Sequence, residues 1–164
     1  MGTRTSEALS FVAADVEVSQ NGECWLPMSC HSTAIAVAGG DRATGEVNVF
    51  CDERPVVKAG KKASQDVTIR FLYTEEPAAT TCVAGMWTDG GPFETIRLWD
   101  DAVGGEIWVR YWPKGKAAAN FVFETGQAII TSFLDPAGEA GAGDPVPGEV
   151  VVKTEELTKS AWVS

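Results

Sequence analysis

The clearest alternation of apolar and polar side chains lies in residues 66–73. Every second position there is apolar, and the positions between are polar. The apolar positions are Val67, Ile69, Phe71 and Tyr73. Because successive side chains of an extended chain point to opposite faces, this period of two predicts an antiparallel strand buried on one face.

Further alternating segments predict a chain built largely of short strands. They are residues 10–19, 23–30, 32–40, 46–52, 93–99, 105–112, 120–133 and 149–158. The dipeptide Asn21-Gly22 joins the first two and is a strong hairpin signal. Helical spacing appears in residues 77–87, where Ala78, Cys82 and Met86 recur every four residues behind Pro77. We therefore expect one short helix at 77–87.

Glycine, proline and polar residues separate these segments. They predict a turn at 39–45, a long polar loop at 53–65 and a Gly/Pro loop at 135–148. Eight or nine short strands with one flanking α-helix predict a mainly β fold, an antiparallel β-sandwich or barrel. We expect one domain over residues 10–156, with a long inter-strand loop and extended terminal arms at 1–9 and 157–164.

Composition and charge narrow the function classes. A chain of 164 residues is long enough to bury its own core. Its formal charge of −10 repels phosphate backbones and anionic membranes, so nucleic-acid binding is disfavoured while passage of nucleic acid is not. No apolar run approaches the roughly 18 residues that a membrane helix needs, so no membrane partner is expected.

The four cysteines show no Cys-x-x-Cys spacing. They are Cys24, Cys30, Cys51 and Cys82. Because three of them fall inside apolar strand or helix patterns, we expect reduced core residues rather than disulfides.

The residues that could carry catalysis are few. His31 is the only histidine, so both a Cys24/Cys30/His31 metal site and a nucleophilic triad would depend on it. A small hydrolase is therefore the weakest reading. The glycine-rich stretches at 39–45 and 138–144 lack the lysine and helix of a phosphate-binding loop, and we expect turns there. The sequence implies no enzyme and no cofactor.

The tryptophans allow a binding function. Trp99, Trp108 and Trp112 could form a platform on which sugars stack, as in a carbohydrate-binding β-sandwich, or they could be core and subunit-contact residues.

Several polar segments suggest assembly. The arms, the 53–65 loop and the Gly/Pro loop would be poorly ordered on a lone monomer, and such segments become ordered against neighbours. Lys58, Lys61 and Lys62 make the 53–65 loop basic on an acidic molecule. A basic projection can meet the acidic surface of the next copy head to tail.

The order of these elements resembles the tail tube (major tail) proteins of long non-contractile phage tails, the siphovirus type. The resemblance covers most of the chain. It rests on an N-terminal arm, a strand pair ending near WLPMSC, the strands STAIAV and EVNVF, and the segment GKKASQDVTIRFLYTEEP with its aspartate-led strand. A short helix, the strands ETIRLW and EIWVRYW, and the closing pair QAIITSF and EVVVKT complete it.

This resemblance implies a structural virion subunit that forms a homo-oligomer, a stack of hexameric rings. The rings would make a tube through which double-stranded DNA passes on ejection, with an inner wall of sheet shared between subunits. Expected partners are a tail terminator, a tape measure and a distal tail protein, and the expected location is the virion tail after assembly in the host cytoplasm. Residues 53–65 would be the stacking loop, and 1–9 and 157–164 the bridging arms. The expected inter-ring contact residues are Arg54, Lys58, Lys61, Lys62 and Trp162.

An acidic channel would let DNA slide, because like charges do not hold phosphates. We therefore expect acids to face the lumen, drawn from Asp15, Glu17, Glu94, Asp100, Asp101, Glu106 and Glu124. The alternatives are another virion β-protein, such as a capsid decoration or tail terminator protein, or the carbohydrate-binding module.

Overall fold

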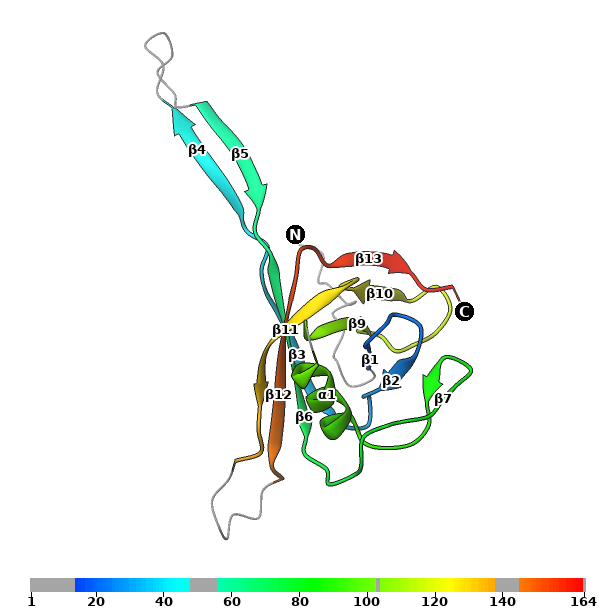
Figure 1. Cartoon of the computed structure of the whole chain (residues 1–164). Coiled ribbons are helices and arrows are strands. Elements are labelled where there is room, and N and C mark those ends of the chain that lie inside the picture. The colour runs from blue at the N-terminus through cyan, green and yellow to red at the C-terminus, as the bar shows by residue number, and fades with distance from the viewer. Residues whose placement is uncertain (1–13, 48–55, 103, 138–144, 164) are drawn as a thin grey trace, which may run out of the picture.

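Figure 1 shows a computed structural model that describes residues 14–47, 56–102, 104–137 and 145–163. Within these ranges the chain forms thirteen strands and one helix. The elements are β1 (Asp15–Ser19), β2 (Trp25–Pro27), β3 (Ser32–Gly39), β4 (Arg42–Val47), β5 (Val56–Lys62), β6 (Gln65–Leu72), β7 (Cys82–Val83), β8 (Met86–Trp87), α1 (Pro92–Asp101), β9 (Glu106–Trp112), β10 (Phe121–Glu124), β11 (Ala128–Leu134), β12 (Pro147–Thr154) and β13 (Thr158–Ala161).

One large sheet folds over to make two layers. Its strand order is β3-β6-β12-β11-β9-β1-β2-β8-β7, with β10 and β13 beside β9. Strands β3, β6, β12 and β11 form what we call the four-strand layer, drawn nearly edge-on in Figure 1. The second layer contains β9, β1, β2, β10 and β13, and it lies with α1 on one side of the four-strand layer. The mainly β prediction is confirmed, in the form of a folded-over sheet.

The core lies between the layers. Val67, Ile69 and Phe71 of β6 are fully buried, as their alternation predicts, and Val18 and Val109 meet them from the second layer. Burying a side chain of this size contributes roughly 1.5–3 kcal/mol to stability.

The region predicted as a turn, a strand and a polar loop is a β-hairpin instead. Strands β4 and β5, which we call the arm, pair from Arg42 with Lys62 to Val47 with Val56 and project away from the body (Figure 1). The arm prolongs β3 and β6, because the Gly40 N–H donates to the Ser64 carbonyl across the junction. Residues 48–55, which include the rest of the predicted strand at 46–52 and the start of the predicted loop, lie outside the described residues.

Strand β3 ends at Gly39, as the paired glycines Gly39 and Gly40 predict. Their φ angles of +84° and +81° belong to the left-handed region. A Cβ on Gly39 would stand 2.7 Å from the Ser64 carbonyl oxygen. The glycines therefore end β3 and bend the chain into the arm, which forms a sheet of its own.

The helix lies one segment later than predicted. Residues 93–99, predicted as a strand, form α1 instead, with Pro92 in the first turn and Phe93, Ile96 and Trp99 buried. Those three residues are spaced by three, which is helical, while the same segment also fits a period of two. Packing of that stripe on the core decides between them.

The predicted helix at 77–87 is wrong. Those residues form a loop with the short hairpin β7–β8, turned at Ala84 and Gly85, whose φ angles of +51° and +78° no α-helix contains. A disulfide between Cys24 and Cys82 ties this loop to the second layer. The expectation of reduced thiols is therefore wrong for this pair, whereas Cys30 is free and exposed.

Two further predicted strands have different boundaries in the structure. Residues 120–133 divide into β10 and β11 at Gly126, whose φ is +63°. The last predicted strand ends at Thr154, and the tail then forms β13, which pairs antiparallel with β10 of the same subunit.

No helix in the described ranges is long and apolar enough to cross a bilayer.

Candidate functional site

The face of the four-strand layer that points away from the core forms a regular surface. Because the inward positions of each strand are buried, the alternate positions stand on this outer face. The register arranges them in three rows: Ala34, Arg70, Glu149 and Leu134 in the first, Ala36, Thr68, Val151 and Ser132 in the second, and Ala38, Asp66, Lys153 and Ile129 in the third. We call these twelve positions the outer face.

Charges on the outer face are paired across neighbouring strands. Arg70 Nε donates to Glu149 Oε2 at 2.7 Å, and Lys153 Nζ lies 3.7 Å from Asp66 Oδ1. These two acids and two bases give the twelve positions no net formal charge. The three positions that β3 contributes are all alanine, so the β3 side of the face is apolar and has only small side chains.

Both lateral edges of the four-strand layer are open in the described part of the chain. Strand β3 pairs with β6 on one side and has no described strand on the other. Strand β11 pairs with β9 through Ala128 and Ile129 only, so residues 131–134 have a strand on the β12 side alone. Unpaired N–H and C=O groups along such an edge are a template for a strand from another chain.

The arm carries the predicted basic residues. Lys58, Lys61 and Lys62 lie on β5 and are exposed, and Arg42 lies across from Lys62. The structure thus brings together three of the predicted inter-ring contact residues and adds Arg42. Arg54 lies outside the described residues.

Trp162 is not on a free tail. Its ring meets Trp112 edge to face at a centroid distance of 5.0 Å, and its backbone N–H donates to Asn120. The tail was predicted to be poorly ordered on a lone monomer, and that is wrong for residues 158–162, because pairing with β10 holds them on their own subunit.

The acids predicted to face a lumen are distributed over four elements. Asp15 and Glu17 are on β1, Glu94, Asp100 and Asp101 are on α1, Glu106 is on β9 and Glu124 is on β10. Only Glu106 borders the outer face, paired across from Ile129. The register places Asp15, Glu17 and Glu124 on the same face of the second-layer strands as Glu106, whereas Glu94, Asp100 and Asp101 lie on the helix.

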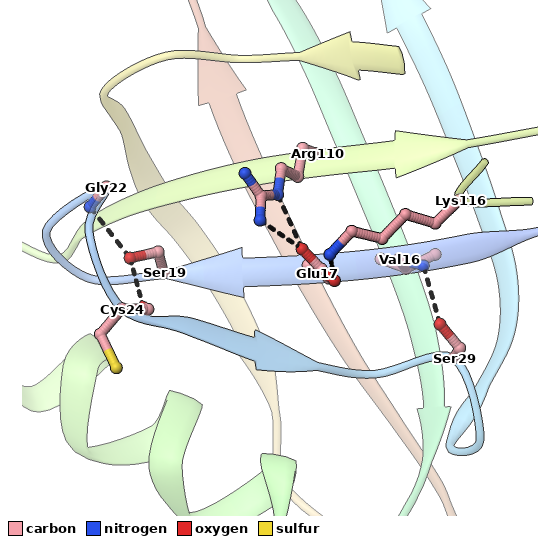
Figure 2. Close-up of polar contacts among 8 residues, drawn as sticks. All are labelled: Val16, Glu17, Ser19, Gly22, Cys24, Ser29, Arg110 and Lys116. Atoms are coloured by element: carbon pink, nitrogen blue, oxygen red, sulfur yellow. Dashed lines mark hydrogen bonds and ion pairs between the residues drawn. The ribbon is translucent and has the colours of Figure 1, made fainter. Parts of the chain in front are cut away.

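Glu17 is buried rather than free to face a channel. Only 4% of it is exposed, and Figure 2 shows Arg110 and Lys116 converging on its carboxylate. Arg110 Nη2 lies 2.6 Å from Oε2, and Lys116 Nζ lies 2.6 Å from Oε1. The guanidinium also stacks 3.7 Å from the Trp25 ring centre. This cluster, which we call the Glu17 cluster, holds the second layer together and leaves the predicted lumen set without Glu17.

The structure weakens the ligand-binding alternatives. Trp112 is fully buried, Trp99 is 5% exposed and Trp108 is half-buried, so these three do not form an exposed row for sugars. The disulfide occupies Cys24 and removes its thiolate from the Cys/Cys/His alternative. Among the described residues no group of three metal-ligating side chains converges.

Comparison with known proteins gives a fold and no family. No protein-family model and no curated protein matches the sequence. A chain from the sheath–tube complex of an extracellular contractile injection system, PVC, in its extended state aligns over 96% of this chain and 95% of its own length, with a TM-score of 0.64 and 14% identity.

Two further structures come from the anti-feeding prophage, AFP. A chain from its baseplate aligns with a TM-score of 0.61 and 9% identity over 98% of each chain. A chain from its tube terminating cap aligns with a TM-score of 0.60 and 12% identity over 90% of this chain and 88% of that one. At such identities the likeness shows the fold alone. It supports the tail-tube type of fold without singling out the non-contractile family, since these particles are contractile injection systems.

The sequence reading missed the outer-face charges as a group. Asp66, Arg70, Glu149 and Lys153 all stand at polar positions of correctly predicted strands. The sequence shows the alternation of these strands, but it does not show which strands are neighbours in the sheet. The pairing β6–β12 joins segments about 80 residues apart, and no local signal encodes it.

Proposed function

We propose that this chain is a structural, non-enzymatic subunit of the tube of a phage tail or a related injection particle. The observation that carries the proposal is the four-strand layer, which has a projecting arm and, as far as the described strands go, two open edges. The fold shared with components of contractile injection systems supports it. The proposed location is the tail, after assembly in the host cytoplasm.

The open edges explain how copies would join. In the layer β3 and β11 run antiparallel, because each of the three steps between them is antiparallel. Rotation about a tube axis preserves strand direction, so β11 of one copy would pair antiparallel with β3 of the next. Repetition of this contact closes a ring, which we propose to be hexameric on the family resemblance.

The position of the rest of the subunit determines which face lines the channel. The second layer and α1 lie on the core side of the four-strand layer (Figure 1). A ring has a longer outer than inner circumference, so the bulky side of each subunit belongs outside. The outer face of the layer would then form the inner wall, along which double-stranded DNA would pass.

The arm would link successive rings. It prolongs β3 and β6 beyond the ring and carries four exposed cations, Arg42, Lys58, Lys61 and Lys62. Exposed acids lie at the end of the layer away from the arm. Glu75 and Glu76 follow β6 there, and Asp135 follows β11. A stacked copy would offer these acids to the arm below. The tail terminator, tape measure and distal tail protein remain the proposed partners.

Negative-stain microscopy of the purified protein tests this proposal. We expect rings or filaments, and a protein that stays monomeric at high concentration would contradict it. Val37→Lys puts a charge on edge strand β3, a common means by which edge strands avoid pairing, and should reduce assembly at least about tenfold. Val83→Lys makes the same change at an exposed position of β7 and should assemble normally.

A second role within the same particles is a tail terminator. The likeness to a chain of the AFP tube terminating cap favours considering it. A terminator would form rings that do not continue into filaments, so the same micrographs separate the two roles.

A further inference from the structure

The charge pattern of the outer face indicates how DNA would move along it. We infer that the inner wall is kept nearly neutral by cross-strand ion pairs, and that Asp66, Arg70, Glu149 and Lys153 set this balance so that DNA is neither held nor repelled. This inference rests on the proposed function, and it replaces the predicted acidic channel with a different physical mechanism.

The cross-strand distances show that these four charges are paired. Each base on the outer face has an acid directly across from it on the neighbouring strand, at 2.7 Å for Arg70 with Glu149 and 3.7 Å for Lys153 with Asp66. The pairs alternate in direction, since β6 contributes Arg70 and Asp66 while β12 contributes Glu149 and Lys153. Opposed dipoles of this kind cancel within a few ångströms, and salt screens what remains over about 8 Å.

The remaining positions of the face reinforce this reading. Ala34, Ala36 and Ala38 have no polar side-chain group that could bind DNA. Glu106 at the border supplies one exposed carboxylate outside the two pairs. The cations of the arm lie beyond the face, at the junction between rings. An unpaired base on the wall would bind phosphate through counterion release, and the pairing prevents that.

Two sets of substitutions shift the balance in opposite directions. Asp66→Asn with Glu149→Gln and Glu106→Gln leaves two bases on each subunit, whereas Arg70→Gln with Lys153→Gln leaves only acids. Exposed pairs of this kind are worth at most about 1 kcal/mol, so both variants should fold and assemble.

Retention of DNA inside tubes is the measurement. Tubes assembled with short duplex DNA are treated with nuclease to remove external DNA and are then sedimented. We expect little protected DNA in the wild-type tubes and still less in the acid-only tubes, whose wall repels phosphates. The base-only tubes should protect at least about tenfold more at low salt and release it as salt rises. Equal protection in wild-type and base-only tubes would overturn the inference.

A labelling experiment tests the wall placement separately. Ala36→Cys in a Cys30→Ser/Cys51→Ser background should react with a small maleimide in both monomers and tubes. A maleimide on a large dextran should react with the monomers alone, while Ser160→Cys on β13 serves as a control that reacts with both reagents in tubes. If dextran reaches Ala36→Cys in intact tubes, the inference fails. If no tubes form, the proposed function fails instead.

Discussion

At the scale of single residues, the Glu17 cluster shows how a charged group becomes part of the core. The carboxylate is almost completely buried, and its cost of desolvation is offset by Arg110 and Lys116 (Figure 2). The Arg110 guanidinium in turn stacks on the Trp25 ring. Removing the Glu17 carboxylate would leave Arg110 and Lys116 without their shared counter-charge.

Glu17→Gln should therefore destabilise the fold strongly. We expect a loss of about 3 kcal/mol in the free energy of unfolding, because Arg110 and Lys116 would lose their shared acceptor. Urea unfolding followed by tryptophan fluorescence measures it. The exposed Glu155→Gln is the control and should change stability by less than about 0.5 kcal/mol. Equal effects would show that the cluster contributes no stability.

Asp89 accepts hydrogen bonds from Thr80 and Thr81 within the loop between Tyr73 and Pro92. Hydrogen bonds from the Thr80 hydroxyl and the Thr81 backbone N–H hold the pKa of Asp89 below its ordinary value of 3.8. A lowered pKa stabilises the folded loop above the unfolded-state pKa, and that contribution is lost as pH falls through the lower, folded-state value.

Hydrogen exchange of the loop amides should therefore quicken as the pH falls below 3.8, beyond the intrinsic pH effect on exchange. Asp89→Asn should remove this additional pH dependence. The amides of β6 provide the internal control, because they do not contact Asp89. A loop whose corrected exchange rate shows no change over this range would contradict the role assigned to Asp89.

The elements show where reasoning from sequence succeeds. Strands β3, β6, β9 and β12 were placed within a few residues, because burial of one face produces an alternation that the sequence shows. Residues 77–101 were assigned in the wrong order, because both segments fit two periodicities. The deciding facts, the Cys24–Cys82 link and the packing of Phe93 on the core, join residues distant in sequence.

The Cys24–Cys82 disulfide should stabilise the loop that it closes. It spans 58 residues of sequence, and closing a loop of that length is worth about 2–4 kcal/mol through restriction of the unfolded chain. Cys24→Ala with Cys82→Ala should lose that amount and become insensitive to reductant in thermal unfolding. Cys30→Ser should behave as wild type. If reductant leaves wild-type stability unchanged, the bond does not contribute.

The arm predicts a separation between ring formation and stacking. Replacing residues 41–63 with Asn-Gly would close β3 and β6 as a short hairpin and leave the four-strand layer intact. We expect rings that no longer form filaments, seen by negative stain and by a fall in sedimentation rate. Filaments from this variant would assign stacking to another segment.

The whole molecule is polar along its strands. The arm with its four cations stands at one end of the four-strand layer, where Glu155 is exposed and Glu156 Oε1 lies 3.8 Å from Lys62 Nζ. Glu75, Glu76 and Asp135 are exposed at the other end, on a chain whose formal charge is −10. Such polarity favours head-to-tail stacking over random association, and its strength falls as salt rises. The sequence disclosed the basic segment, while only the fold shows which acids lie at the opposite end.

The central claim is that copies share one sheet through β3 and β11. Cryo-electron microscopy of filaments formed by the purified chain tests it most directly. We predict residues 131–134 of one copy beside β3 of the next, antiparallel and about 4.8 Å apart. Filaments in which both edges face solvent, or are covered by other elements, would contradict the account.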